Sequence, residues 1–201
     1  MRTSVMLEEV GQLVAGRHEN PFALLGPHQV VASGREATAV RAFLPRSSQA
    51  WVIDQAHQTP RPMRRIHPAG LFEAICPMAN DDGDAKGKGA ARYMIRAADD
   101  GGKKTTMHDP YSFPQLLTDY DLHLFNEGRH WRCYDKLGAQ VRTIDGVTGV
   151  NFSVWAPNAT GLSVIGDFNA WDSRCHPMRK HIPSGFWELF VPGLEVGEVY
   201  K

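Results

Sequence analysis

Carboxylate and imidazole side chains gather in one stretch of the sequence, and they are the residues that acid–base chemistry would use. Between residues 108 and 130 lie four carboxylates and three histidines: Asp109, Asp119, Asp121, Glu127, His108, His123 and His130. Cleavage or transfer of a glycosidic bond requires two carboxyl groups that face one bond across a cleft. Nothing in the sequence places two of these carboxylates in that way. We interpret Asp109, together with Pro110-Tyr111, as capping a strand end and the other residues as solvated charges of a connecting segment, and we predict no catalytic residue.

Metal binding and nucleophilic catalysis lack their usual patterns. His123 and His130 are seven residues apart without the HExxH spacing of a zinc-binding helix. The three cysteines, Cys76, Cys133 and Cys175, form no CxxC pair, which favours buried or free thiols. The sequence has no GxSxG motif, no P-loop, and no GxGxxG motif in a strand–turn–helix context. We expect no metal and no cofactor.

A different kind of site is centred on Trp171, which follows the turn-forming residues Gly166, Asp167 and Asn169. A tryptophan just past a turn is poorly placed to enter a core, and it can offer a flat apolar face to a ligand. Asn169 beside it can donate and accept hydrogen bonds. The alternative is that Trp171 packs over the turn as a lid on the fold.

Short strands separated by turns are predicted to position these residues. Alternation over 150–155, a break at Pro157-Asn158 and an apolar run over 162–165 indicate two strands joined by a turn. Other predicted elements are a helix over 4–15, strands at 38–44, 50–54, 71–76 and 92–97, and loops at 79–91 and 99–105. Residues in strand patterns usually face a core, which we expect for Trp51, Trp155 and Trp187, whereas Trp131 is undecided.

The second half of the chain repeats the first. Leu25-Gly26, Pro45 and Ile53 recur as Leu137-Gly138, Pro157 and Ile165, each at a sequence offset of 112. Further on, three segments recur with an offset of 115: 62–65 at 177–180, 70–73 at 185–188, and Pro77 at Pro192. Two constant offsets with one insertion between them indicate a duplicated domain. The insertion falls at the turn of Asn169 and Trp171, and the equivalent turn in copy one, 56–62, has no aromatic residue. We therefore expect a packing or spacer role for copy one.

These patterns predict a mainly all-β chain of two tandem immunoglobulin-like β-sandwiches with a short N-terminal helix. Residues 1–112 would form the first module with its helix, 113–127 a linker, and 128–201 the second module. Tyr200-Lys201 aligns with Arg92-Tyr93, which opens a strand in copy one. The second sandwich is therefore expected to lack its last strand, and the chain to be a fragment with an exposed sheet edge.

Composition narrows the classes of partner. Lys and Arg total 22, as do Asp and Glu, so the formal net charge is zero and a nucleic-acid partner is not expected. No apolar run approaches the roughly 20 residues needed to cross a bilayer. Glu8 and Glu9 interrupt the apolar stretch that a signal peptide would need. We expect a cytoplasmic protein with no membrane partner.

Four segments resemble the starch-binding-type β-sandwich that precedes the catalytic barrel of glycogen branching enzymes. They are WAPNA at 155–159, GDFNAW at 166–171, HPM at 176–178 and WELFVPGL at 187–194. HENPFALLGPH at 18–28 resembles the opening of the module before that sandwich. The resemblance covers nearly the whole chain and is to the amino-terminal, non-catalytic part of the 1,4-α-glucan branching enzyme family.

The resemblance implies a function for the intact enzyme and for this part of it. The enzyme would transfer α-1,4-glucan segments to form α-1,6 branches in glycogen biosynthesis, and this portion would bind or orient the glucan, glycogen or a maltooligosaccharide. Trp171 and Lys201 match positions of the glucan platform in related modules, with Asn169 nearby. This chain alone would not be an enzyme, because a (β/α)8 barrel by itself takes about 250 residues.

The implied partners are therefore an α-glucan and the catalytic barrel of the same polypeptide, which these residues do not include. Two alternatives stay open at this point. The chain could be a structural spacer or interaction module without a sugar site, or the equivalent module of a debranching enzyme.

Overall fold

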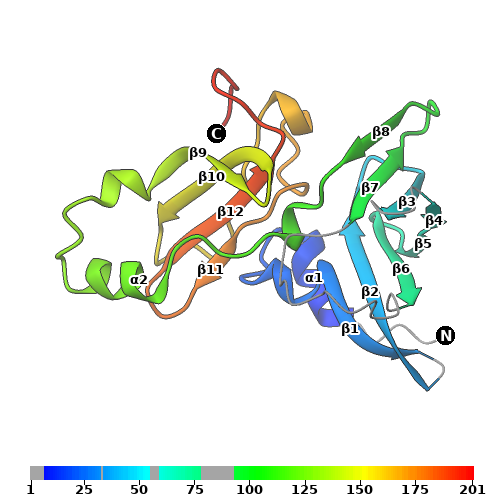
Figure 1. Cartoon of the computed structure of the whole chain (residues 1–201), viewed down its shortest axis with the longest axis horizontal. Coiled ribbons are helices and arrows are strands. Elements are labelled where there is room, and N and C mark those ends of the chain that lie inside the picture. Colours follow the sequence, from blue (N-terminus) through cyan, green and yellow to red (C-terminus); the bar gives the residue numbers. More distant parts are fainter. Residues whose placement is uncertain (1–6, 33, 55–58, 78–92) are drawn as a thin grey trace. The chain divides into compact units, whose positions relative to one another are not determined.

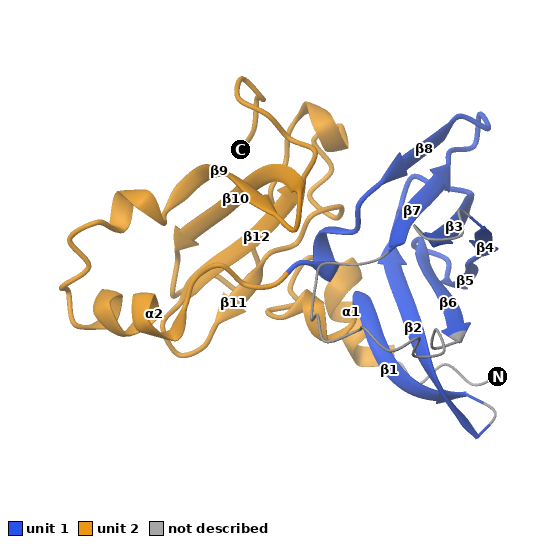
Figure 2. Cartoon of the chain, in the orientation of Figure 1, with its two compact units in different colours: residues 1–3, 25–113 blue, residues 4–24, 114–201 orange. Residues whose placement is uncertain are grey.

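The structure is a computed structural model that describes residues 7–32, 34–54, 59–77 and 93–201. In these residues the chain forms two α-helices and twelve β-strands, which make three antiparallel four-stranded sheets (Figure 1). The chain divides into two compact units (Figure 2). Unit 1 holds the described residues within 25–113, and unit 2 holds those within 4–24 and 114–201. The expected all-β fold class is confirmed.

Unit 1 contains two sheets. The first has the strand order β1-β2-β6-β5, with β1 at Gly26–Ala32, β2 at Arg35–Phe43, β6 at Leu71–Pro77 and β5 at Arg64–His67. The second has the order β4-β3-β7-β8, with β4 at Pro60–Pro62, β3 at Gln49–Asp54, β7 at Tyr93–Ala98 and β8 at Lys104–Met107. Apolar residues of both sheets share one core, in which Val40 and Phe72 of the first sheet pack with Val52 and Ile95 of the second.

Unit 2 contains one regular sheet and both helices. The strand order is β11-β12-β10-β9, with β11 at Arg179–His181, β12 at Phe186–Pro192, β10 at Val147–Trp155 and β9 at Gly138–Ile144. The helices are α1 at Leu7–Val14 and α2 at Asp119–Asn126. Thr118 and Asp121 begin α2 with a capping box, in which each side chain accepts from the other residue's backbone N–H. Helix α2 therefore lies inside the segment that the sequence predicts to be a linker.

The two units repeat the same strand plan. Strands β1 and β9, and likewise β2 and β10, begin and end at positions offset by 112, while β6 and β12 are offset by 115. Pairing partners also repeat, since Trp51 pairs with Pro62 in unit 1 and Ser163 pairs with Pro177 in unit 2. The predicted internal repeat is confirmed. It also extends further upstream than predicted, because the first and last residues of α1 and α2 show the same offset of 112.

A glycine makes the same close approach in each copy. Gly70 and Gly185 have φ angles of 104° and 76°, in the region that favours glycine. A Cβ on either one would lie 2.6 Å from the Cα of a proline, Pro45 in unit 1 and Pro157 in unit 2. A side chain at either position is therefore excluded by backbone, and the glycine is required by the fold.

One buried glutamate per copy differs in its partners. Glu73 on β6 accepts from the Arg41 guanidinium at 3.0 Å. Its equivalent on β12, Glu188, accepts from the backbone N–H of Leu117 at 2.9 Å and of Leu116, and contacts His181 Nε2 at 3.1 Å. Burial raises the pKa of Glu188, but these hydrogen bonds outweigh it and hold the pKa below its usual value. In unit 2 this carboxylate thus fastens the segment before α2 to the sheet.

The tryptophans predicted to lie in the core differ in their burial. Trp187 is fully buried, as predicted, and Trp51 is half-buried. The prediction is wrong for Trp155, whose side chain is 60% exposed. Trp155 is the last residue of β10, and its indole Nε1 donates to the carbonyl oxygen of Ser184 at 3.2 Å, which holds the ring at the end of the sheet. Trp131 is 87% exposed. The loop predicted at 79–91 lies outside the described residues.

Candidate functional site

The site predicted around Trp171 is built on a tight turn. Residues Asp167–Asn169 form one turn of 3-10 helix, and the backbone N–H of Trp171 donates to the carbonyl oxygen of Gly166 at 2.9 Å. Ala170 and Trp171 have φ angles of 54° and 60°, which non-glycine residues adopt infrequently. A Cβ on Gly166 would collide with the carbonyl oxygen of Val199 and with the ring of Phe168. The turn therefore has one well-defined shape.

Asn169 is the internal brace of this turn. Its side chain is buried, its Oδ1 accepts from the backbone N–H of Gly166 at 3.0 Å, and its Nδ2 donates to the carbonyl oxygen of Val164 at 2.9 Å. The same Nδ2 lies 2.8 Å from Nδ1 of His176. Desolvation by burial lowers the pKa of His176 to about 4, so at pH 7 this imidazole is neutral and its Nδ1 can accept. The Asn169 amide thus holds the turn through intramolecular bonds.

Trp171 presents its ring at the surface of the turn. The side chain is 44% exposed, and the indole Nε1 donates to Asp167 Oδ1 at 2.8 Å. This hydrogen bond and the backbone bond to Gly166 fix the ring from two sides. An exposed aromatic ring in a fixed orientation is suited to stacking against a flat apolar partner.

Lys201 lies beside the same turn. Its backbone N–H donates to the carbonyl oxygen of Ile165 at 2.7 Å, and the N–H of Ile165 donates back at 2.9 Å. The backbone of Trp171 is thus hydrogen-bonded to Gly166, and the backbone of Lys201 to the neighbouring residue Ile165. The sequence prediction missed Tyr200, which is 48% exposed and whose ring lies edge-on to Phe152 at 4.9 Å. The sequence alignment matched Tyr200 with Arg92, which is one residue out of register, because Gly166 pairs with Tyr200 as Asp54 pairs with the buried Tyr93.

Asp121 is buried, so its interpretation as a solvated charge is wrong, whereas Asp109, expected to cap a strand end, is buried and caps the 3-10 turn at Pro110–Ser112 that follows β8. Asp109 accepts from the Tyr93 hydroxyl at 2.6 Å and from the Tyr111 backbone N–H at 3.0 Å. Burial raises the pKa of Asp109 to about 6, although these two bonds oppose the shift. Asp121 is buried too, and hydrogen bonds from His130, Thr118 and Lys136 overcome desolvation and hold its pKa well below the usual value. Both carboxyl groups serve the fold.

Other site classes find no support in the part of the chain that the structure describes. No group of three or more His, Cys, Asp or Glu side chains there could hold a metal ion. Within the same residues, neither helix is long and apolar enough to cross a membrane.

Two family models together match most of the chain. The model of the alpha-1,4-glucan branching enzyme GlgB N-terminal domain matches residues 6–111. The model of carbohydrate-binding module 48, described as the isoamylase N-terminal domain, matches residues 136–201. The second match contains the whole Gly166–Trp171 turn and Lys201.

Curated relatives are similar along the whole chain. The 1,4-alpha-glucan branching enzyme GlgB of Rhodopirellula baltica is 46% identical over 201 residues, which are 100% of this chain and 26% of that protein. The enzyme of the same name from Rhodopseudomonas palustris is 48% identical over 194 residues, which cover 96% of this chain and 25% of that protein. The chain thus spans about a quarter of the length of these relatives.

Solved structures are more distant. A pullulanase from Anoxybacillus sp. LM18-11 is 16% identical with a TM-score of 0.25, covering 82% of this chain and 22% of that chain, and such a likeness carries no argument. The family models and the relatives therefore identify the family, and they agree with the resemblance seen in the sequence motifs. The chain belongs to the alpha-1,4-glucan branching enzyme GlgB family, as its non-catalytic N-terminal domain followed by a carbohydrate-binding module 48.

Proposed function

We propose that unit 2 binds α-glucan at the Gly166–Trp171 turn, with Trp171 as the stacking platform and Lys201 as a hydrogen-bond donor. The observation that carries this proposal is the exposed Trp171 ring, held by two hydrogen bonds on a turn of fixed shape. A rigid platform loses little conformational entropy when a sugar ring stacks on it. Lys201 can donate to sugar hydroxyls, since its ammonium group carries three N–H donors.

In this proposal Asn169 contributes by positioning the platform. Its amide is used by Gly166, Val164 and His176, so the sugar meets the turn that Asn169 holds rather than the amide itself. Tyr200 adds a second exposed ring next to Lys201. In this proposal the Trp171 ring and the Lys201 ammonium group together suit a neutral chain of pyranose units.

The role within the whole enzyme follows from the family. The relatives carry the name branching enzyme, and we propose that the intact protein transfers α-1,4-glucan segments to form α-1,6 branches in cytoplasmic glycogen. The partners in this proposal are the glucan and the catalytic domain of the same polypeptide. This unit would present glucan to that domain. The competing proposal is a spacer without a sugar site, and it predicts that Trp171 has no part in glucan behaviour.

Electrophoresis in a native gel that contains glycogen tests the proposal. One shallow platform gives weak binding, on the order of −4 to −6 kcal/mol, or high micromolar to millimolar affinity. We expect glycogen to retard the 201-residue chain, and Trp171→Ala to reduce the retardation. The matched control is Trp131→Ala, which removes a tryptophan that is 87% exposed and lies outside the turn. Equal mobility of the wild type and Trp171→Ala would support the spacer.

A further inference from the structure

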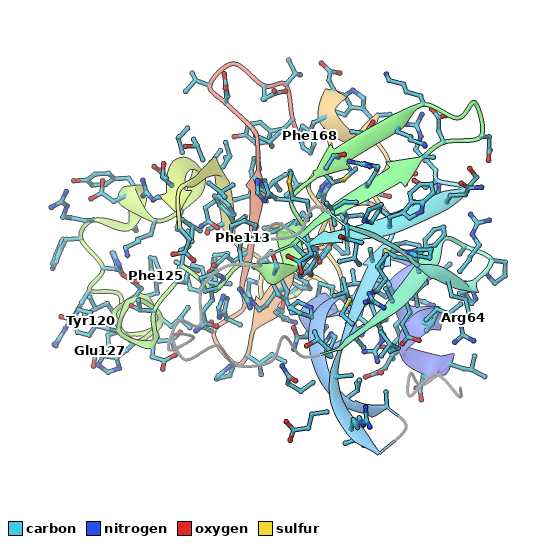
Figure 3. The ribbon with its side chains drawn as sticks, turned by 45° about the vertical axis from the view of Figure 1, so that its right-hand side comes forward. Arg64, Phe113, Tyr120, Phe125, Glu127 and Phe168 are labelled. Carbon is cyan, nitrogen blue, oxygen red and sulfur yellow. The ribbon has the colours of Figure 1, made fainter. Side chains whose placement is uncertain are left out.

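A second concave site lies in unit 2, at a different place from the Trp171 turn. It is a pocket of about 490 Å³ whose walls include Phe125, His130, Cys133, Trp155, Ser184 and Phe186. This volume falls within the roughly 300–1,000 Å³ that small-molecule sites occupy. Figure 3 shows Phe125 on α2 apart from Phe168 of the Trp171 turn, and in Figure 1 α2 and that turn lie at opposite ends of unit 2.

Aromatic rings form one wall of this pocket. The ring of Phe125 stacks on the ring of Phe186 with a centroid distance of 4.4 Å, and on the imidazole of His130 at 4.2 Å. Trp155 adds a fourth ring, which is 60% exposed and fixed by the hydrogen bond from its Nε1 to Ser184. This wall is rigid before any ligand arrives, so its ordering adds no cost to binding.

His130 places one unsatisfied polar atom at this aromatic wall. Its side chain is 9% exposed, and its Nε2 lies 3.0 Å from Asp121 Oδ1. Because the Asp121 carboxylate is an acceptor, Nε2 is the donor of this pair, and Nδ1 is the ring nitrogen left for another partner. This Nδ1 is buried and has no hydrogen-bond partner among the described residues. An unpaired buried polar atom costs free energy, which a ligand hydroxyl would recover.

We propose that this pocket is a second saccharide site, which takes one pyranose unit of an α-glucan. The sugar stacks a C–H face on Trp155, and one of its hydroxyls forms a hydrogen bond with Nδ1 of His130. An apolar side chain of another protein would fill the same volume but leave Nδ1 unpaired, which is why we favour a hydroxyl-bearing ligand. The site does not require Trp171.

The free thiol of Cys133 in the pocket wall makes the proposal testable on the wild-type chain. Cys76, which lies in unit 1, serves as the internal reference, and Cys175, which follows the Trp171 turn, reports on that turn. The rate of alkylation of each thiol by N-ethylmaleimide is measured by peptide mass spectrometry, with maltotriose and with the same concentration of sorbitol. Sorbitol matches the hydroxyl content but has no pyranose ring.

We expect maltotriose, and not sorbitol, to slow the alkylation of Cys133. The slowing reaches about tenfold at ten times Kd, because the unliganded fraction falls by that factor. Cys76 stays unchanged. Trp155→Ala removes the protection, and Trp131→Ala, a change at a tryptophan outside the pocket wall, preserves it. Trp155→Leu, which keeps apolar volume without a flat ring, gives the same loss and serves if Trp155→Ala fails to fold.

Unchanged alkylation of Cys133 in the wild type would overturn the second site, and it is the outcome expected if a protein segment fills the pocket. Protection that survives in both Trp155 variants would overturn it too. Trp171→Ala separates this proposal from the one above. Cys133 should stay protected in that variant whether or not the Trp171 turn binds glucan, so either site can fail without the other.

Discussion

The two units share one strand plan and differ at one turn. Strands β2 and β10 match end to end at an offset of 112, and β6 and β12 at an offset of 115. The three additional residues of unit 2 fall between them, in the turn that carries Trp171. In unit 1, β3 forms continuous ladders with β4 and β7. The equivalent residues of unit 2 make isolated bridges, Ser163 with Pro177 and Gly166 with Tyr200.

The comparison separates the residues that maintain the fold from those that distinguish one copy. Gly70 and Gly185 make the same approach to a proline, and Phe72 and Trp187 occupy the same buried position on β6 and β12. These positions have the same structural role in both copies. The turn beside Gly166 has no such shared role, and at this turn unit 2 has an exposed aromatic ring, Trp171. The proposed glucan site thus lies on a connection between strands, while the sheets supply a common frame.

The largest expected effect tests whether the two copies use the same core position. Trp187 and Phe72 are fully buried, so truncation of either to alanine leaves a cavity. We expect Trp187→Ala and Phe72→Ala each to lower the free energy of unfolding by about 3–5 kcal/mol. Urea unfolding followed by circular dichroism measures the change. Trp131→Ala, at an exposed position, should stay within about 0.5 kcal/mol. A loss below about 1 kcal/mol for either core variant would mean that the copies do not share this position.

A smaller effect contrasts the buried titratable groups of the two units. For His176 in unit 2 the folded pKa is about 4 and the usual value 6.5, so the unfolded chain takes up the proton first as pH falls. The free energy of unfolding should then decrease between about pH 6.5 and 4. For Asp109 in unit 1 the folded pKa is about 6 and the usual value 3.8. The folded chain holds that proton, so its contribution decreases as pH rises from about 4 to 6.

Two variants separate these opposing contributions. His176→Gln should remove the decrease in unfolding free energy between about pH 6.5 and 4. Asp109→Asn should remove the decrease that occurs as pH rises from about 4 to 6. Each contribution has a limiting slope of about 1.4 kcal/mol per pH unit, measured from urea midpoints at pH 4.5, 5.5 and 7. The two substitutions should change the slope of unfolding free energy against pH in opposite directions. A change in the same direction would mean that the assigned burial of one group is wrong.

The sequence predicts much of this fold because apolar residues, prolines and glycines recur with constant offsets. Gly185 and Pro157 belong to those recurrent residues, and their contact is repeated in the structure. The repeat of the helices escaped prediction, because LEEVGQLV and DYDLHLFN share a length and a position but almost no residue types. Helix α2 depends on its capping box rather than on a strong apolar face, and such local hydrogen bonding is faint in a sequence.

The candidate site was predictable in part for similar reasons. A tryptophan after a run of turn residues indicated an exposed ring, and Trp171 is exposed. The burial of Asn169 was not predictable, because it depends on Val164 and His176 meeting its amide across the turn. The exposure of Trp155 was missed because strand alternation does not show where a strand ends. Side-chain hydrogen bonds across a turn and the point at which a strand ends decide these cases, and the periodicity of apolar residues indicates neither.

The central claim is that the turn that distinguishes unit 2 from unit 1 binds glucan. The most direct measurement is a ¹H–¹⁵N spectrum of the five tryptophan indole groups during titration with maltoheptaose. We expect the Trp171 signal to shift with saturation, while Trp51 of unit 1 and the buried Trp187 stay in place. A Trp171 signal that does not move at tens of millimolar saccharide, about ten times the expected Kd or more, would contradict the claim.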